Sequence, residues 1–102
     1  GVFPYLIARL NHGWKVRQEC RGLKRSPLSY LRRFTYDTIS HAPEPLRYLI
    51  NLVGADRVML GSDYCFDMGY ERPVKVVTAL KLGRSDEEKI LGGNAARLLR
   101  LV

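Results

Sequence analysis

Asp63 is the side chain best placed for chemistry, because a run of apolar residues leads into Gly61, Ser62 and Asp63. Residues 57–61 are nearly all apolar, as expected of a parallel strand that is buried on both faces. In α/β barrels the active site lies at the carboxyl ends of the strands, where a carboxylate can bind a metal ion or act as a base. Aspartate is also common as a capping residue in loops, so the pattern alone leaves both interpretations open.

The two histidines stand at less informative positions. His41 follows a second predicted strand, residues 34–39, where a ligand or a general base could lie. A surface or loop-packing histidine is the commoner case and the one that we favour. His12 falls in a predicted helix and is more typical of a structural or interface histidine. Together with Asp63 they do not match a compact metal motif such as H-x-H or H-E-x-x-H, so metal binding does not follow from the spacing.

Arg9 and Arg17 are spaced for joint recognition of an anion. They lie eight residues apart in a predicted helix, about two turns, so both side chains can point the same way. The planar guanidinium binds a carboxylate in a bidentate manner, which makes paired arginines suitable for a carboxylate-bearing ligand. Two solvated or ion-paired arginines are the alternative, and the pattern alone favours it.

Asp37 and the two cysteines complete the candidates. Asp37 lies in the middle of the strand predicted over residues 34–39, so we expect it to be buried and to need a polar partner. We expect Cys65, which follows Asp63, to be a small packed residue rather than a reactive thiol. With Cys20 as the second of two cysteines, the sequence predicts free thiols in a reducing cytoplasm rather than a disulfide framework.

Helices and strands alternate along the chain and must position these residues. The two predicted strands are residues 34–39 and 57–61. The predicted helices cover residues 4–19, 45–53, 73–82 and a last segment from Ser85. Pro4 and Pro45 are typical of a first helical turn, and Gly54 of a helix end. Ser85 with Glu88 predicts a capping box. An apolar stripe is expected on the first helix from Tyr5, Leu6, Leu10 and Trp14.

The alternation predicts an α/β fold in which two parallel strands are joined by a right-handed crossover. Two strands cannot form a sheet that is both covered and closed. Their buried faces therefore need neighbours from outside these 102 residues. Because the chain also starts at Gly1 rather than at Met, we expect an incomplete domain from within a longer protein.

Composition excludes some classes of function. Apolar residues make up 46% of the chain and charged residues 26%, a balance typical of a globular protein. No apolar run approaches the roughly 18 to 20 residues of a membrane span. The net charge of +7 suggests nucleic acid, but no RNA-binding motif or zinc-finger spacing accompanies it. The dense basic stretch over residues 17–33 fits a solvated face, an anion site or a subunit surface.

Four segments, in this order and spacing, resemble the C-terminal third of the amidohydrolase-related family: FPYLIARLNHGW, SYLRRFTYDTISH, ADRVMLGSDYCF and EEKILGGNAARLL. The resemblance covers residues 1–101, and the GSDY and GGNAARLL segments are its most specific parts. The branch that it resembles most is the one typified by aminocarboxymuconate-semialdehyde decarboxylase. It implies that residues 1–102 are the C-terminal portion of a (β/α)₈ barrel of the TIM type.

The resemblance also implies roles for particular residues. Asp63 matches the last-strand aspartate that binds the divalent metal, most often zinc, and takes part in catalysis. The histidine ligands would lie upstream, because Gly1 resembles the last glycine of a histidine-containing turn. Arg9 matches an arginine that reaches across a dimer to the substrate carboxylate, and Arg17 is a weaker neighbouring candidate. Cys65 stands where proline is common in the family.

The function so implied is that of a metal-dependent decarboxylase or hydrolase acting on a small carboxylate-bearing substrate. It would work as a homo-oligomer, a dimer, in the cytoplasm, with neither nucleic acid nor membrane as a partner. A single metal ligand, Asp63, falls within this chain, so these residues alone would be inactive. The rival hypothesis is a non-catalytic remnant, or a partner-binding module, that keeps the same fold.

Overall fold

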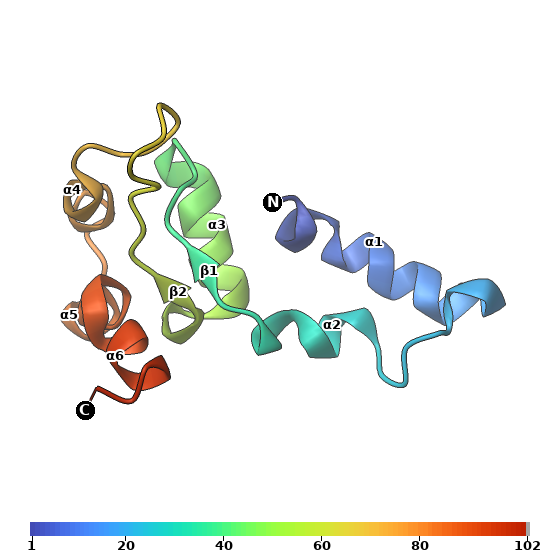
Figure 1. Cartoon of the computed structure of the whole chain (residues 1–102). Coiled ribbons are helices and arrows are strands. Elements are labelled where there is room, and N and C mark those ends of the chain that lie inside the picture. The colour runs from blue at the N-terminus through green and yellow to red at the C-terminus, as the bar shows by residue number, and fades with distance from the viewer. Residues whose placement is uncertain (102) are drawn as a thin grey trace. The chain divides into compact units, whose positions relative to one another are not determined.

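The computed structural model describes residues 1–101. They form two compact units, which meet in the sequence between Phe34 and Thr35. The first unit is helical, and the second contains both strands, so the predicted alternation of helices and strands is confirmed there (Figure 1). No helix within residues 1–101 is long and apolar enough to cross a membrane.

The first unit is built from α1 (Phe3–Val16) and the short helix α2 (Pro27–Tyr30). Each is followed by a 3₁₀ turn, at Gln18–Cys20 and Leu31–Arg33 respectively. α1 ends earlier than the prediction of residues 4–19, because Arg21 turns back onto its last carbonyls. Arg21 Nε donates to Trp14 O at 3.3 Å and its Nη2 donates to Lys15 O at 2.7 Å, which satisfies groups that the helix end leaves open.

The contact between α1 and α2 buries few side chains. Ile7 is the buried residue of α1, and Leu31 is buried directly after α2. The backbone N–H of Leu28 donates to Asn11 Oδ1 at 3.3 Å and joins the two helices. The predicted apolar stripe is therefore wrong in part, because Tyr5 is 80% exposed and Leu10 is 45% exposed.

The second unit is centred on β1 (Tyr36–Asp37) and β2 (Val58–Met59), which pair in parallel. Parallel pairing confirms the prediction, but both strands are shorter than the predicted residues 34–39 and 57–61. In a sheet of two strands each has one hydrogen-bonded neighbour. The parallel hydrogen-bond ladder is therefore limited to the pairs Tyr36 with Val58 and Asp37 with Met59.

Helices flank the two strands on both sides. α3 (Pro43–Val53) lies on the β1 side, and α4 (Pro73–Thr78) and the helices after it lie on the β2 side (Figure 1). α3 starts two residues before the predicted Pro45, and α4 is shorter than the predicted residues 73–82. Gly54 ends α3, as predicted, with a positive φ of 89° that glycine adopts at little cost. The apolar core of this unit consists of Leu46, Ile50, Val53, Ala55, Val58, Val77, Leu80 and Ile90.

The last helix is continuous but not uniform. α5 (Arg84–Glu88), a π-helical segment (Lys89–Gly93) and α6 (Asn94–Leu98) follow one another directly. The glycine pair of the sequence thus lies in a wider turn and does not end the helix. The predicted capping box is wrong, because the helix starts before Ser85 and Glu88 binds Arg84 at 2.8 Å instead.

Asn94 joins this helix to the start of β2. It is 3% exposed, and its Nδ2 donates to Ala55 O at 2.7 Å and to Val58 O at 2.8 Å. Arg97 Nη2 donates to Asn94 Oδ1 at 3.2 Å and to Asp56 O at 3.1 Å. The GGNAARLL segment therefore serves packing: its amide satisfies buried carbonyls that would otherwise be costly to desolvate.

Candidate active-site edge

Asp63 lies beyond the carboxyl end of β2, in the loop that leads to α4, as the sequence predicted. Its φ of 56° is the left-handed conformation that aspartate tolerates better than most residues. It does not cap α4, whose N-cap residue is Arg72. The Asp63 side chain is exposed and has no hydrogen-bond or ion-pair partner within residues 1–101. A carboxylate without a partner at this edge is available to a ligand.

The loop that carries Asp63 is closed at its base by backbone contacts. The N–H of Tyr70 donates to Ser62 O at 2.7 Å, so the two ends of the loop are joined. Gly69 packs onto this junction: a Cβ there would lie 2.5 Å from Ser62 O and 2.9 Å from Asp63 O. Any side chain at position 69 would therefore displace the backbone next to Asp63.

Thr38 extends the strand pairing into this loop. It is completely buried, and its Oγ1 accepts the N–H of Gly61 at 3.2 Å and lies 3.4 Å from Gly61 O, to which it can donate. Gly61 directly precedes Ser62, so the side chain of Thr38 fixes the start of the loop relative to the end of β1. Sequence reasoning missed Thr38, because a threonine in a strand looks like an ordinary β-branched residue.

His41 follows β1 at the same edge of the sheet, and it contacts Tyr70. The His41 backbone N–H donates to the Tyr70 hydroxyl, and the two rings lie 4.9 Å apart between centroids with a tilt of 43°. His41 has a positive φ of 58° and an exposed side chain. A histidine packed in a loop was the favoured interpretation, and this ring contact agrees with it. Tyr70 was not singled out from the sequence, since a tyrosine in a polar loop carries no distinguishing pattern.

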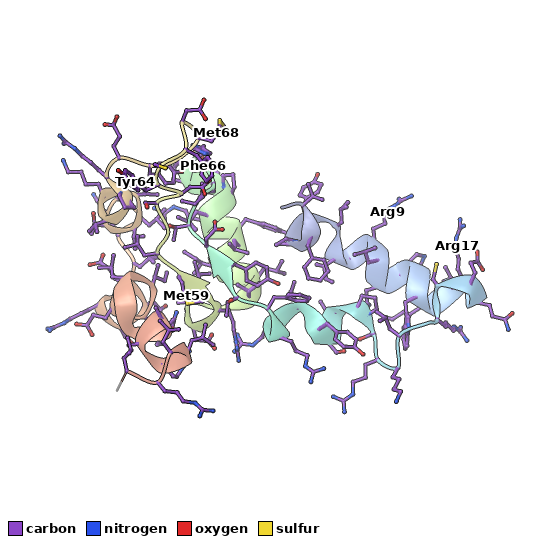
Figure 2. All side chains as sticks on the ribbon, viewed as in Figure 1. Arg9, Arg17, Met59, Tyr64, Phe66 and Met68 are labelled. Atoms are coloured by element: carbon purple, nitrogen blue, oxygen red, sulfur yellow. The ribbon has the colours of Figure 1, made fainter. Side chains whose placement is uncertain are left out.

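The tip of the loop presents apolar side chains to solvent. Tyr64 is 90% exposed, Phe66 71% and Met68 64%, and Figure 2 shows the three gathered beyond the ends of the strands. Cys65 is also exposed, so the expectation of a packed residue is wrong in this structure. A cluster of exposed large apolar side chains is typical of a surface that meets a ligand or another polypeptide segment.

Asp37 is exposed, which contradicts the expected burial. Its Oδ1 accepts the N–H of Ile39 at 2.8 Å, a local turn that gives the carboxylate a partner near in sequence. Within residues 1–101, β2 is the one strand that pairs with β1, so the other edge of β1 has no strand beside it. Tyr36, on the same strand, is partly buried, and this burial raises the pKa of its phenol because the phenolate is disfavoured.

Arg9 and Arg17 both lie in the first unit, but in different settings. Arg9 is on α1, whereas Arg17 is the residue after the helix end, with an extended φ of −115°. The expectation of two arginines on one helical face is therefore wrong for Arg17. Its Nη1 lies 3.9 Å from Glu19 Oε1 and both groups are largely exposed. Figure 2 shows both arginines extending outward from the chain. His12 is exposed on α1.

An apolar groove of about 660 Å³ runs along α1 in the first unit. Its walls include Leu6, Leu10 and Trp14, three members of the predicted stripe, and Arg9 also lines it. The first unit holds eight of the 17 lysines and arginines but one of the ten acidic residues. The whole net charge of +7 therefore resides in Gly1–Phe34.

The chain does not hold a set of metal ligands. Within residues 1–101, no three His, Cys, Asp or Glu side chains lie close enough together to bind one metal ion. Asp63 does fit the part of a single oxygen ligand, because its carboxylate is exposed and has no partner. Further ligands would have to come from outside the described residues.

Sequence relatives bear out the resemblance. A family model described as Amidohydrolase matches residues 2–101. The chain is 35% identical over 104 residues to 2-amino-3-carboxymuconate-6-semialdehyde decarboxylase of Dictyostelium discoideum. That match covers 99% of this chain and 29% of the relative. The chain thus spans less than a third of the length of this relative.

Solved structures match the fold. The 5-carboxyvanillate decarboxylase of Sphingomonas paucimobilis is 26% identical with a TM-score of 0.79, over 97% of this chain and 31% of its own. The dihydroxybenzoic acid decarboxylase of Polaromonas sp. JS666 was solved with bound manganese and 2-nitroresorcinol. It is 21% identical with a TM-score of 0.79, and the match covers 98% of this chain and 31% of that protein. The two parallel strands and their helices therefore match part of a decarboxylase of this fold. Both the predicted family and the predicted branch are confirmed: the chain belongs to the amidohydrolase family and is related to its decarboxylases.

Proposed function

We propose that the chain forms the last-strand portion of the active site of a divalent-metal-dependent decarboxylase. The observation that carries the proposal is the placement of Asp63, an exposed carboxylate without a partner at the carboxyl edge of a parallel pair. In this proposal the 102 residues are the C-terminal portion of a (β/α)₈ barrel, and the remaining strands supply the other metal ligands. The active sites of such barrels lie at this edge.

Asp63 would bind the metal through its carboxylate oxygens. A divalent ion at that position supplies a Lewis acid that stabilises negative charge developing on the substrate. We propose zinc from the family resemblance, while the relative from Polaromonas holds manganese. A carboxylate suits either ion, so Asp63 by itself does not select between them.

Arg9 would bind the carboxylate of the substrate, with Arg17 as the weaker candidate. Arg9 is exposed on α1, which leaves its guanidinium available to a second subunit. In this proposal the enzyme is a homodimer and Arg9 reaches the site of its partner. A bidentate arginine fixes both the position and the orientation of a carboxylate.

The substrate would be a small acid with an unsaturated or aromatic carbon skeleton. The relatives are decarboxylases, which favours loss of a carboxylate over hydrolysis. The exposed Tyr64 and Phe66 lie one and three residues after Asp63 and offer an apolar surface to such a skeleton. The low number of cysteines in the sequence, Cys20 and Cys65, is the basis on which we propose a reducing compartment such as the cytoplasm.

A second candidate function is a partner-binding module without catalysis. The apolar groove along α1 and the concentration of positive charge in Gly1–Phe34 favour it. Such a module would use Arg9 and Arg17 on its surface and would not need Asp63.

The assay that separates the two is release of CO₂ by the full-length protein. The substrates to use are 2-amino-3-carboxymuconate 6-semialdehyde and 5-carboxyvanillate, the acids in the names of the relatives. We expect turnover of one such acid, its loss after chelation and its return with zinc or manganese. Turnover that survives complete removal of metal, or no turnover of any such acid by the metal-loaded protein, would contradict the proposal.

A further inference from the structure

Tyr70 connects the two segments that follow β1 and β2, through its side chain and its backbone respectively. Its hydroxyl oxygen accepts the backbone N–H of His41, which follows β1. Its own N–H donates to Ser62 O at 2.7 Å, in the loop that follows β2. One residue thus spans the edge of the sheet at which Asp63 lies.

The hydrogen bond between Tyr70 and Ser62 lies next to Asp63 in the sequence. Ser62 is joined to Asp63 by a single peptide bond, and its carbonyl is the acceptor of the Tyr70 N–H. Gly69, the neighbour of Tyr70, packs against the backbone of both residues. A shift of Tyr70 must therefore move the backbone on which the Asp63 carboxylate stands.

The contact with His41 has two separable parts. One is the hydrogen bond from a backbone N–H to the hydroxyl, which phenylalanine would remove. The other is the ring contact at 4.9 Å between centroids, which phenylalanine would keep. Substitution of the tyrosine can therefore remove the link to β1 while the packing stays in place.

We propose that Tyr70 is a positioning residue for the metal ligand Asp63, and that its hydroxyl holds the Asp63 loop against the segment that follows β1, at His41. The inference rests on the proposed function, because it needs Asp63 to bind a metal. A residue that orients a ligand without touching the metal typically changes metal affinity about 10- to 100-fold when it is removed. Tyr70 would act in this way through the Ser62 peptide.

The test measures affinity for Zn²⁺ and for Mn²⁺ in the full-length protein by competition with a chromophoric chelator. Tyr70→Phe removes the hydroxyl and keeps the ring, and Tyr70→Leu removes both. Tyr5→Phe, at a tyrosine that is 80% exposed on α1, is the matched loss of a hydroxyl elsewhere. The thermal midpoint of each metal-free protein is recorded alongside, as a measure of folding that does not depend on the metal.

We expect Tyr70→Phe to weaken binding of both ions about 10- to 100-fold, with the metal-free midpoint close to that of the wild type. Tyr70→Leu should weaken binding at least as much, and Tyr5→Phe should leave it unchanged. Wild-type affinity in Tyr70→Phe would overturn this inference alone. A large fall in the metal-free midpoint would also overturn it, since Tyr70 would then be a structural residue. A wild-type protein that binds neither ion would overturn the proposed function itself.

Discussion

The side chains at the carboxyl edge of the sheet divide into those that face solvent and those that hold the backbone. Asp63 is exposed without a partner, whereas Thr38 and Tyr70 are committed to hydrogen bonds that join one strand end to the other. A left-handed residue such as Asp63 needs this support, because its conformation is less stable than the extended one. Metal binding at this edge would thus depend on Thr38 and Tyr70, which would not themselves bind the metal.

Arg9→Ala is predicted to raise the KM for the carboxylate substrate about 10- to 100-fold. The reason is that a charge-assisted pair contributes roughly 1.5 to 3 kcal/mol, and each 1.4 kcal/mol is about tenfold. Steady-state kinetics of the full-length protein would measure it, if the proposed decarboxylase function holds. Arg17→Ala is the matched control and should have a smaller effect, because Arg17 lies beyond the helix and near Glu19. Equal effects of the two changes, or none from Arg9→Ala, would refute this assignment.

Residue types and spacing predict which residues are candidates for the site, but not how exposed those residues are or what they contact. The position of Asp63 follows from an apolar strand before it, and the structure agrees. The exposure of Asp37 and the departure of Arg17 from the helix do not follow from the sequence pattern. Both depend on local contacts: Asp37 accepts the N–H of Ile39 in a turn, and α1 ends where Arg21 binds its carbonyls.

At the scale of elements, the two strands are held more by their surroundings than by their own ladder. β1 and β2 pair over two residues each. Beyond the ladder, Thr38 binds Gly61, and Asn94 binds the backbone on either side of the start of β2. The last helix is thereby coupled to the strand whose end carries Asp63.

Asn94→Ala is predicted to lower the free energy of unfolding by about 2 to 4 kcal/mol, because two buried carbonyls lose their donor. Denaturant unfolding of the full-length protein would measure the change. Asn51→Ala, at an exposed asparagine on α3, should change it by less than about 0.5 kcal/mol. If the two variants were equally stable, the bonds of Asn94 would not contribute to stability as described.

Gly69→Ala is predicted to weaken metal binding, because the new Cβ would meet Ser62 O at 2.5 Å and must push the loop base apart. Gly92→Ala is the control, since a Cβ there meets nothing within 4 Å. Metal titration of both variants in the full-length protein would compare them. Wild-type affinity in Gly69→Ala would mean that the loop base does not govern the position of Asp63.

The periodicity of apolar residues and the positions of proline predict most of the helices of this chain. They predict less well where each helix begins and ends. Gly54 ends α3 where its type predicts. The capping box at Ser85 was wrong, because Glu88 has a nearer partner in Arg84. The π-helical turn at Lys89–Gly93 was not predicted, because π-helical turns are rare and the helical spacing of apolar residues does not distinguish them from an α-helix.

At the scale of the whole chain, the apolar surface exceeds what 102 residues can cover. Val16, Leu28 and Phe34 in the first unit, and Leu98, Leu99 and Leu101 at the end of the second, are among the exposed large apolar side chains. The chain spans less than a third of its relatives, so the remainder of such a protein would offer partners for these faces. The asymmetry of charge, +7 in the first unit and none in the second, would persist in any such assembly.

The 102-residue chain produced by itself is predicted to be marginally stable. Small domains bury a low fraction of their surface, and the exposed apolar faces lower it further. We expect a broad thermal transition and binding of a hydrophobic dye, whereas the full-length protein should melt sharply and bind little dye. A sharp transition without dye binding in the short chain would show that it is a self-sufficient domain.

The most direct test of the central proposal is the metal content of the full-length protein with Asp63→Ala, beside wild type and Asp67→Ala. Asp67 lies in the same loop and is also exposed, so its change matches the loss of charge. We predict that Asp63→Ala loses the bound metal and its turnover with an unchanged circular dichroism spectrum, while Asp67→Ala retains both. Full metal content in a folded Asp63→Ala variant would contradict the assignment of Asp63 as a ligand and favour the partner-binding function.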